Sequence, residues 1–305
     1  MDCNHRGAID LHVHSTASDG TLTPVQILRR ALALGLTAVA ITDHDTVDGV
    51  RSALSHKCPK GIEFITGIEI SAAPPVGFQI IGSLHILGYG ILPEHPELLK
   101  TLAVLQKSRI NRIPKIIRRL NQLGIPIREK DVQDQSGGGI AGRAHVAMAM
   151  VKNGYAQSMD DAFCRYIGKG QPAYVDKFRI SSNDAIRIIG QAGGISVLAH
   201  PYLTTGNWTE IQRLVRVLAN MGLQGLEVLY PEHPRQVREA LAELTRQHRL
   251  LMTGGSDFHG SIKPEIEMGS GYGDLFVPFS IYQSLVRCAY RRHSQAVRVE
   301  SSITK

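Results

Sequence analysis

The sequence alternates short apolar runs with amphipathic stretches of helical periodicity along most of its 305 residues. A buried strand followed by a covering helix produces this pattern, which is typical of α/β proteins with a parallel sheet. We expect seven strands, at residues 8–13, 38–42, 63–66, 83–87, 195–199, 225–229 and 250–253. Seven strands of one kind predict an α/β fold in the form of a distorted (β/α) barrel.

The alternation stops between about residues 93 and 178, where helical periodicity continues without a convincing strand. A long helix is expected from about 97 to 123, ending at Gly124. Arg109 interrupts its otherwise apolar stripe and should face the barrel. We therefore predict a catalytic barrel from residues 1–92 and 179–305, and a helical insertion at 93–178 that binds the substrate.

Composition and charge narrow the class of protein. The chain is 43% hydrophobic and 20% charged, which excludes a disordered chain or a coiled coil. No apolar run reaches the roughly 18 residues of a membrane span, so we predict a soluble, cytoplasmic protein with no membrane partner and no evident protein partner. The net charge is +7, and residues 100–128 include eight basic residues and no acidic one. This excess favours an anionic partner.

Two histidines end the first predicted strand. Residues two apart in a strand share a face, so His12 and His14 project together and could hold one cation. A lone His-x-His pair is a weak pattern. This pair, however, lies at the carboxyl end of a predicted parallel strand, where α/β folds place their active sites.

Potential metal ligands follow or end the other predicted strands as well. They are Asp43, His44, Asp45, Glu69, His85, His200, Asp257 and His259. Each one alone could be an ordinary core histidine, a helix cap or a turn residue. Their repetition at one rim of one barrel instead predicts a metal centre.

The motifs that contain these residues resemble those of the polymerase and histidinol phosphatase (PHP) family of metal-dependent phosphoesterases. They are S-x-x-S-D-G at 15–20, T-D-H-D at 42–45, G-x-E-I-S at 67–71, L-H-I-L-G-Y at 84–89, A-H-P at 199–201 and G-S-D-F-H at 255–259. The stretches 142–145 and 170–175 look most like the branch of 3′,5′-nucleoside bisphosphate phosphatases and 5′-to-3′ RNA exonucleases. One departure is the connection at residues 72–82, which is longer than is usual in the family.

The resemblance implies a site for three divalent metal ions. The implied ligands are His12, His14, Glu69 and Asp257 for the first ion, Glu69, His85 and His200 for the second, and Asp19, His44 and His259 for the third. Nitrogen and carboxylate ligands without thiolate suit manganese, iron or zinc. The resemblance favours manganese.

Such ions activate water and neutralise a phosphoryl group, so no protein nucleophile is required. We expect Asp257 to accept a proton from the attacking water, and Asp19 is a candidate donor to the leaving oxygen. Asp10, Asp43 and Asp45 are expected to accept hydrogen bonds from the ligating imidazoles or to cap helices.

A substrate with a second phosphate needs cations away from the metals, and Arg109, Arg112 and Arg143 are the candidates. We predict hydrolysis of the 3′-phosphate of 3′,5′-bisphosphorylated nucleosides, such as adenosine 3′,5′-bisphosphate to AMP, and 5′-to-3′ trimming of short RNA. One alternative is a histidinol-phosphate phosphatase or a general phosphomonoesterase. The alternative outside the enzymes is a nucleic-acid-binding module that uses the basic insertion.

Overall fold

The computed structural model describes residues 7–56 and 58–289. The strands are β1 (Ile9–Val13), β2 (Ala38–Ile41), β3 (Glu63–Ala73), β4 (Leu84–Tyr89), β5 (Ile180–Ser181), β6 (Ile195–Leu198), β7 (Gly225–Leu229) and β8 (Leu251–Gly254). The helices are α1 (Pro24–Ala33), α2 (Asp48–Ser55), α3 (Pro96–Gln122), α4 (Glu129–Gln133), α5 (Arg143–Lys152), α6 (Met159–Ala162), α7 (Ser182–Gln191), α8 (Pro201–Thr205), α9 (Trp208–Asn220) and α10 (Arg235–Gln247). Short π- and 3₁₀-helices occupy Phe163–Ile167 and Gly260–Ile262. All seven predicted strands are present, and the two-residue β5 is additional.

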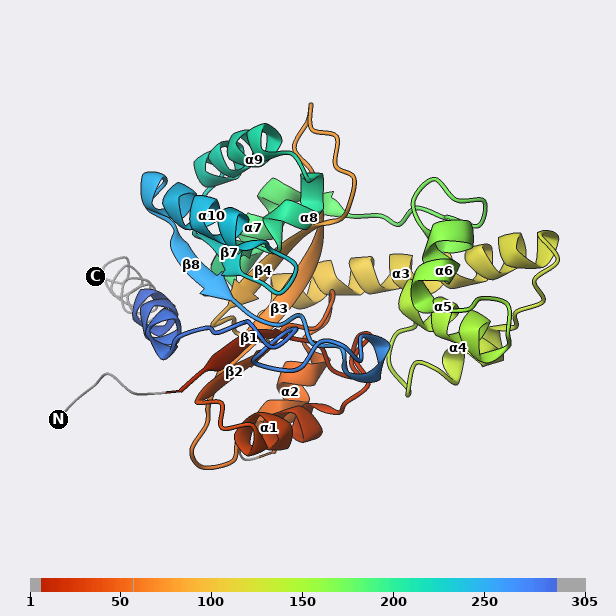
Figure 1. Cartoon of the computed structure of the whole chain (residues 1–305), viewed down its shortest axis with the longest axis horizontal. Helices are drawn as coiled ribbons and strands as arrows, with labels where there is room; N and C mark the ends of the chain where they lie inside the picture. Colours follow the sequence, from red (N-terminus) through yellow and green to blue (C-terminus); the bar gives the residue numbers. More distant parts are fainter. Residues whose placement is uncertain (1–6, 57, 290–305) are drawn as a thin grey trace.

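The sheet has the strand order β1-β2-β3-β4-β6-β7-β8, and β5 pairs with β3 (Figure 1). Its ends approach each other, because Ile9 N donates to Val277 O at 3.0 Å and Val13 forms a parallel bridge with Phe258. The predicted α/β fold with a curled, barrel-like sheet of seven strands is confirmed.

The prediction of a wholly parallel sheet is wrong at β4, which runs antiparallel to both β3 and β6. In the described chain, no helix lies between β3 and β4, so the chain turns back directly into the neighbouring strand. This reversal brings the first residues of β4 to the rim where the parallel strands end.

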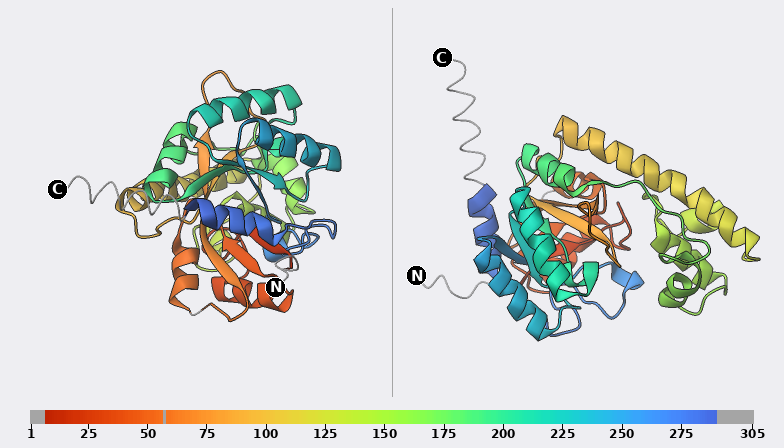
Figure 2. Two further views of the ribbon diagram at one scale, coloured as in Figure 1. Left: turned by 90° about the vertical axis from the view of Figure 1, so that its left-hand side faces the viewer. Right: turned by 90° about the horizontal axis from the view of Figure 1, so that it is seen from above.

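Helices α1 and α2 cover the β1–β2 side of the sheet, and α7, α9 and α10 cover the β6–β8 side (Figures 1 and 2). Helix α1 begins as its sequence predicts: Thr23 accepts a hydrogen bond from Gln26 N, and Pro24 occupies the first turn. Ile27 and Leu28 of α1 pack against the buried strands. These helices cover the outer face of the curled sheet, while strand residues such as Leu11 and Val197 pack with one another on its inner face.

Helix α3 leaves the sheet and carries α4, α5 and α6 at its far end (Figures 1 and 2). Leu98 and Leu102 in its first half pack in the barrel's largest apolar cluster. Ile116 and Leu120 in its second half pack with α5 in a separate cluster. One helix therefore joins the barrel to the helical layer. Among the described residues, none of the helices has both the length and the apolar surface needed to cross a membrane.

Candidate metal centre

The predicted metal ligands all meet at one rim of the sheet. They are His12, His14, Asp19, His44, Glu69, His85, His200, Asp257 and His259. Seven of the nine are buried, and His44 and His85 are nearly so. Segments far apart in the sequence thus contribute to one enclosed cluster.

Two of these ligands reach the rim by a route that differs from the predicted one. His85 is the second residue of β4, and it lies at the rim because β4 is antiparallel. Strand β3 continues beyond the predicted end at Thr66 to Ala73, so Glu69 lies inside the strand. Glu69 nevertheless faces the cluster, since it forms a parallel bridge with His44 just after the end of β2.

The carboxylate of Glu69 lies at the centre of the cluster. Its Oε1 is 2.8 Å from His85 Nδ1 and 3.1 Å from His200 Nε2. Its Oε2 faces three further imidazole nitrogens at 2.9–3.5 Å, those of His12, His14 and His44. The two oxygens of this carboxylate therefore face two different sets of imidazoles.

The donor atoms of the cluster fit divalent cations. Three groups of side chains have ligand atoms that all lie within 4.8 Å of one another: His14, Asp19, His44 and His259; His12, His14 and Asp257; and His44, Glu69 and His85. Several of these atoms are buried without a hydrogen-bond partner: His12 Nε2, His14 Nε2, Asp19 Oδ1, His44 Nδ1 and Glu69 Oε2. Buried polar atoms are normally paired, and bound cations would satisfy these.

The electrostatics keep the carboxylates charged. Burial alone raises the pKa of Glu69, but His44 and His85 hold it well below its usual range. Burial also lowers the pKa of His44 to about 4, which leaves a neutral imidazole. Burial has the same effect at His14, but Asp257 and Glu69 outweigh it and raise the pKa of His14 to about 10, so a cation bound there would replace the proton of His14. Deprotonated carboxylates and neutral imidazoles are the forms that bind metal ions.

The same forces keep Asp257 and Asp19 charged. Burial opposes the shift in each case, yet Lys263 and His259 keep the pKa of Asp257 well below its usual range. His44 and His259 do the same for the pKa of Asp19. Both carboxylates are therefore available as metal ligands.

Glu227, a fully buried residue of β7, was not predicted as part of the site. Its Oε1 lies 2.8 Å from His12 Nδ1, and its Oε2 accepts a hydrogen bond from His200 N at 2.8 Å. Glu227 thereby orients His12 and holds the backbone at His200. A charged residue inside the apolar run 225–229 was the available signal.

Asp10, Asp43 and Asp45 were expected to accept hydrogen bonds from the ligating imidazoles or to cap helices, but the hydrogen bonds that they accept come from other groups. Asp10 instead accepts from the backbone of His12, Ser256 and Gly269. Asp43 accepts from Ser15 and Ser18, and Asp45 accepts from Ser71 and Arg109. These hydrogen bonds hold the loops that carry the metal ligands, and none of them involves an imidazole nitrogen.

Backbone strain is concentrated beside the cluster. Outside glycine, four described residues have positive φ, and three of them are His200 (28°), Asp257 (55°) and Asp45 (56°). Such conformations persist where the surrounding contacts enforce them, and they are common at functional sites.

A small cavity of about 130 Å³ adjoins the cluster and is rich in cations. Asp19, His44 and His85 line one side of it. Five basic residues line the rest: Arg109, Arg112, Arg143, Lys177 and Arg179. The three predicted arginines are thus brought together next to the metal ligands, and Lys177 and Arg179 are additional. We call this cavity the cationic pocket.

The cations of this pocket are only partly neutralised. Arg109 pairs with Asp45 at 3.1 Å, and Lys177 reaches the same carboxylate at 3.4 Å. Arg112 donates through Nε to Val175 O, while its buried second guanidinium nitrogen has no partner. Burial and Arg109 lower the pKa of Lys177 to about 7. The pocket therefore has excess positive charge and an unsatisfied donor, which suit a phosphate group.

A larger cavity of about 730 Å³ opens beside the same metal ligands and includes Lys263. Asp257 Oδ2 accepts a hydrogen bond from Tyr230 OH at 2.9 Å and from Lys263 Nζ at 3.1 Å. The ligand cluster is therefore accessible from two cavities.

Ligands for divalent cations and a neighbouring pocket for anions are what a metal-dependent hydrolase of phosphate esters requires, and the comparisons with known proteins place the chain in this class. The chain belongs to the PHP domain family, whose model matches residues 10–220.

Characterised relatives and a solved structure agree with this family. The chain is 36% identical to the 5′-3′ exoribonuclease Rnm of Escherichia coli over 88% of this chain and 90% of the relative. It is 34% identical to the 3′,5′-nucleoside bisphosphate phosphatase of Chromobacterium violaceum over 82% and 87% of the two chains. A candidate metal-dependent phosphoesterase from Bifidobacterium adolescentis has a similar fold, with a TM-score of 0.81, 29% identity and coverage of 94% and 97%.

Proposed function

We propose that the chain removes the 3′-phosphate from 3′,5′-bisphosphorylated nucleosides and also shortens 5′-phosphorylated RNA from its 5′ end. The observation that carries the proposal is the shared cavity in which Asp19, His44 and His85 face Arg112, Arg143 and Lys177. A substrate with two phosphates can occupy the metal centre with one and the cationic pocket with the other. The activities named for the two bacterial relatives support this assignment.

The metal centre holds up to three divalent ions in this proposal, with manganese preferred to iron or zinc. The ligands are those of the three groups of the cluster, completed by His200 beside Glu69. When bound, such ions activate water and neutralise charge on the reacting phosphoryl group.

The chain's own residues position the substrate. Helix α3 supplies Arg109 and Arg112 and α5 supplies Arg143, so the insertion at 93–178 acts as the substrate-binding part. Tyr230 and Lys263 fix the orientation of Asp257 through its Oδ2. The proposal also includes a cytoplasmic location. A nucleotide or a short RNA is the only partner that it requires.

The excess of cations separates this function from its alternatives. A phosphatase for substrates with one phosphate, such as histidinol phosphate, needs no second anion pocket beside the metals. A binding module without activity needs neither the nine converging ligands nor their buried unpaired donor atoms.

Phosphate release by the purified chain loaded with Mn²⁺ tests the proposal. We expect kcat/KM for adenosine 3′,5′-bisphosphate to exceed that for adenosine 3′-monophosphate by about tenfold or more, since each charge-assisted hydrogen bond to the second phosphate is worth about 1.5–3 kcal/mol. Histidinol phosphate serves as the competing substrate. Equal turnover of all three would rule out recognition of a second phosphate.

The pH dependence of substrate preference should show whether the charge of Lys177 contributes to binding of the second phosphate. Below its pKa of about 7 the ammonium is charged and attracts the second phosphate, and above that pH it is neutral. From pH 6 to pH 8 we expect the ratio of kcat/KM for the bisphosphate to that for the 3′-monophosphate to fall by about tenfold, the effect of one charge-assisted hydrogen bond. Lys177→Met should flatten this profile, and an unchanged profile in the variant would exclude Lys177 as its source.

A further inference from the structure

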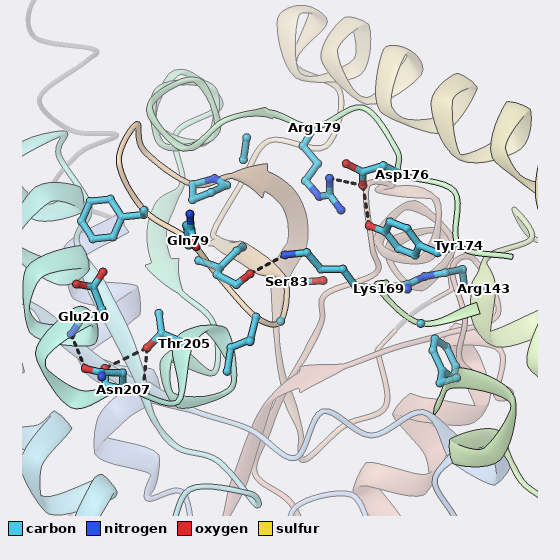
Figure 3. A pocket seen from close by; sticks show the side chains of 18 residues that line it. Gln79, Ser83, Arg143, Lys169, Tyr174, Asp176, Arg179, Thr205, Asn207 and Glu210 are labelled. Atoms are coloured by element: carbon cyan, nitrogen blue, oxygen red, sulfur yellow. Dashed lines mark hydrogen bonds and ion pairs between the residues drawn. The ribbon is translucent and has the colours of Figure 1, made fainter. Parts of the chain in front are cut away.

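A cavity of about 960 Å³ lies between the connection from β3 to β4, the start of α9 and the returning segment of the insertion (Figure 3). The connection supplies Phe78 and Gln79, the region of α9 supplies Asn207 and Glu210, and the insertion supplies Lys169. The metal centre and its cationic pocket do not account for this space.

The cavity adjoins the cationic pocket. Ser83, Arg143, Phe163 and Arg179 line both of them. Figure 3 shows Arg143 and Arg179 on the side of the cavity that also carries Tyr174 and Asp176. The arginines that would hold a phosphate in the cationic pocket therefore also border this cavity.

The wall formed by the connection is held in place from both sides. Ile81 N donates to Thr204 O at 3.1 Å, and the Arg213 guanidinium lies 4.1 Å from the centre of the Phe78 ring. From the insertion, Lys169 Nζ donates to Ile80 O at 2.7 Å. The connection therefore forms one wall of the cavity.

The chemistry of the cavity differs from that of the pocket beside it. Away from the shared arginines, its charged residues are Lys169, Asp176 and Glu210, so it has no excess of positive charge for another phosphate. Its lining combines apolar surface with the amides of Gln79 and Asn207. Phe78 is only 9% exposed and packs in the barrel's largest apolar cluster, so it contributes apolar surface to the wall of the cavity. An apolar surface with amide groups at its edge suits a neutral heterocycle.

We propose that this cavity binds the nucleobase of the substrate, with Phe78 and Gln79 as residues that determine affinity for the base. The inference rests on the proposed function. The base and the two phosphates leave a ribose in three directions, and here three adjoining sites receive them: the metal centre, the cationic pocket and this cavity. The volume of about 960 Å³ holds either a purine or a pyrimidine.

The test compares two substrates of the Mn²⁺-loaded full chain: adenosine 3′,5′-bisphosphate and methyl riboside 3,5-bisphosphate, which lacks a base. The variants are Phe78→Leu, which retains an apolar packing residue, and the surface substitution Gln79→Ala. We expect each to raise KM for the nucleotide, by about tenfold for Phe78→Leu, with kcat nearly unchanged. Turnover of the base-free substrate should not change. Phe276→Leu is the control, because Phe276 is 60% exposed and lines none of the three cavities.

Each outcome separates the two proposals. If Phe78→Leu raised KM equally for both substrates, its role would be structural and the base site would be overturned. Unchanged KM values in both variants would overturn it as well. A selective effect of Tyr272→Ala, in the cavity that contains Lys263, would also overturn it by placing the base there. If the unaltered chain hydrolyses neither substrate, the proposed function itself fails.

Discussion

Replacing Glu69 with glutamine is expected to lower kcat/KM for phosphate release by about 1,000-fold or more, since bound metal ions supply several kcal/mol of transition-state stabilisation. Both oxygens of this carboxylate face imidazole nitrogens, with Oε1 at 2.8 Å from His85 and Oε2 at 2.9 Å from His44. The amide keeps the size of the side chain but removes the negative charge and one acceptor. Metal content, measured by elemental analysis of the purified variant, should fall together with activity.

Glu239→Gln is the matched control for this substitution. Glu239 is exposed on α10 and pairs with Arg235 one turn away, so its loss should leave both metal content and turnover unchanged. A Glu69→Gln variant that retained full metal content and near-normal turnover would contradict the central role of this carboxylate.

Replacing Glu227 with glutamine is expected to weaken metal affinity or activity by about 10- to 100-fold, the usual effect of losing a partner of a ligating histidine. Glu227 Oε1 lies 2.8 Å from His12 Nδ1, and the interaction orients the imidazole and increases its basicity. Metal titration followed by activity measures the effect. Because Glu227 acts through His12 and is not itself among the candidate ligands, the loss should be smaller than in Glu69→Gln.

Folding must be distinguished from metal binding in this second experiment. Glu227 also accepts from His200 N, and the buried site tolerates little change of shape. Circular dichroism and the Tm of the metal-free protein provide this control. If excess metal does not recover any activity although the fold is intact, Glu227 has a role beyond positioning His12.

The two predicted parts of the site differ in how well the sequence indicates them. His12 and His14 lie two residues apart at the end of one strand and so share a face, and strand geometry alone predicts that they act together. Arg112 and Lys177 are far apart in the sequence, and Lys177 belongs to no periodic pattern that aims it at the pocket. Its place beside Asp45 and Ser71 depends on how the insertion returns to the barrel.

The local pattern of the chain determined the strands, the helix starts and the residues available for metal binding. These features depend on neighbours within a few positions, through side-chain alternation, capping and apolar periodicity. The sequence also predicted that ligands at strand ends would converge, because parallel strands share a common edge.

Only the tertiary structure decided the direction of β4, the partner of His12 and the shape of the cavities. Strand β4 pairs antiparallel with β3, and Glu227 of β7 contacts His12 of β1. Residues of the irregular connection from β3 to β4 line the largest of the three cavities. These contacts are stabilised by burial and by the pairing of polar groups in the complete fold. Glu227, for example, would be costly to bury without His12 and His200 as partners. No local pattern encodes which distant group will meet that need.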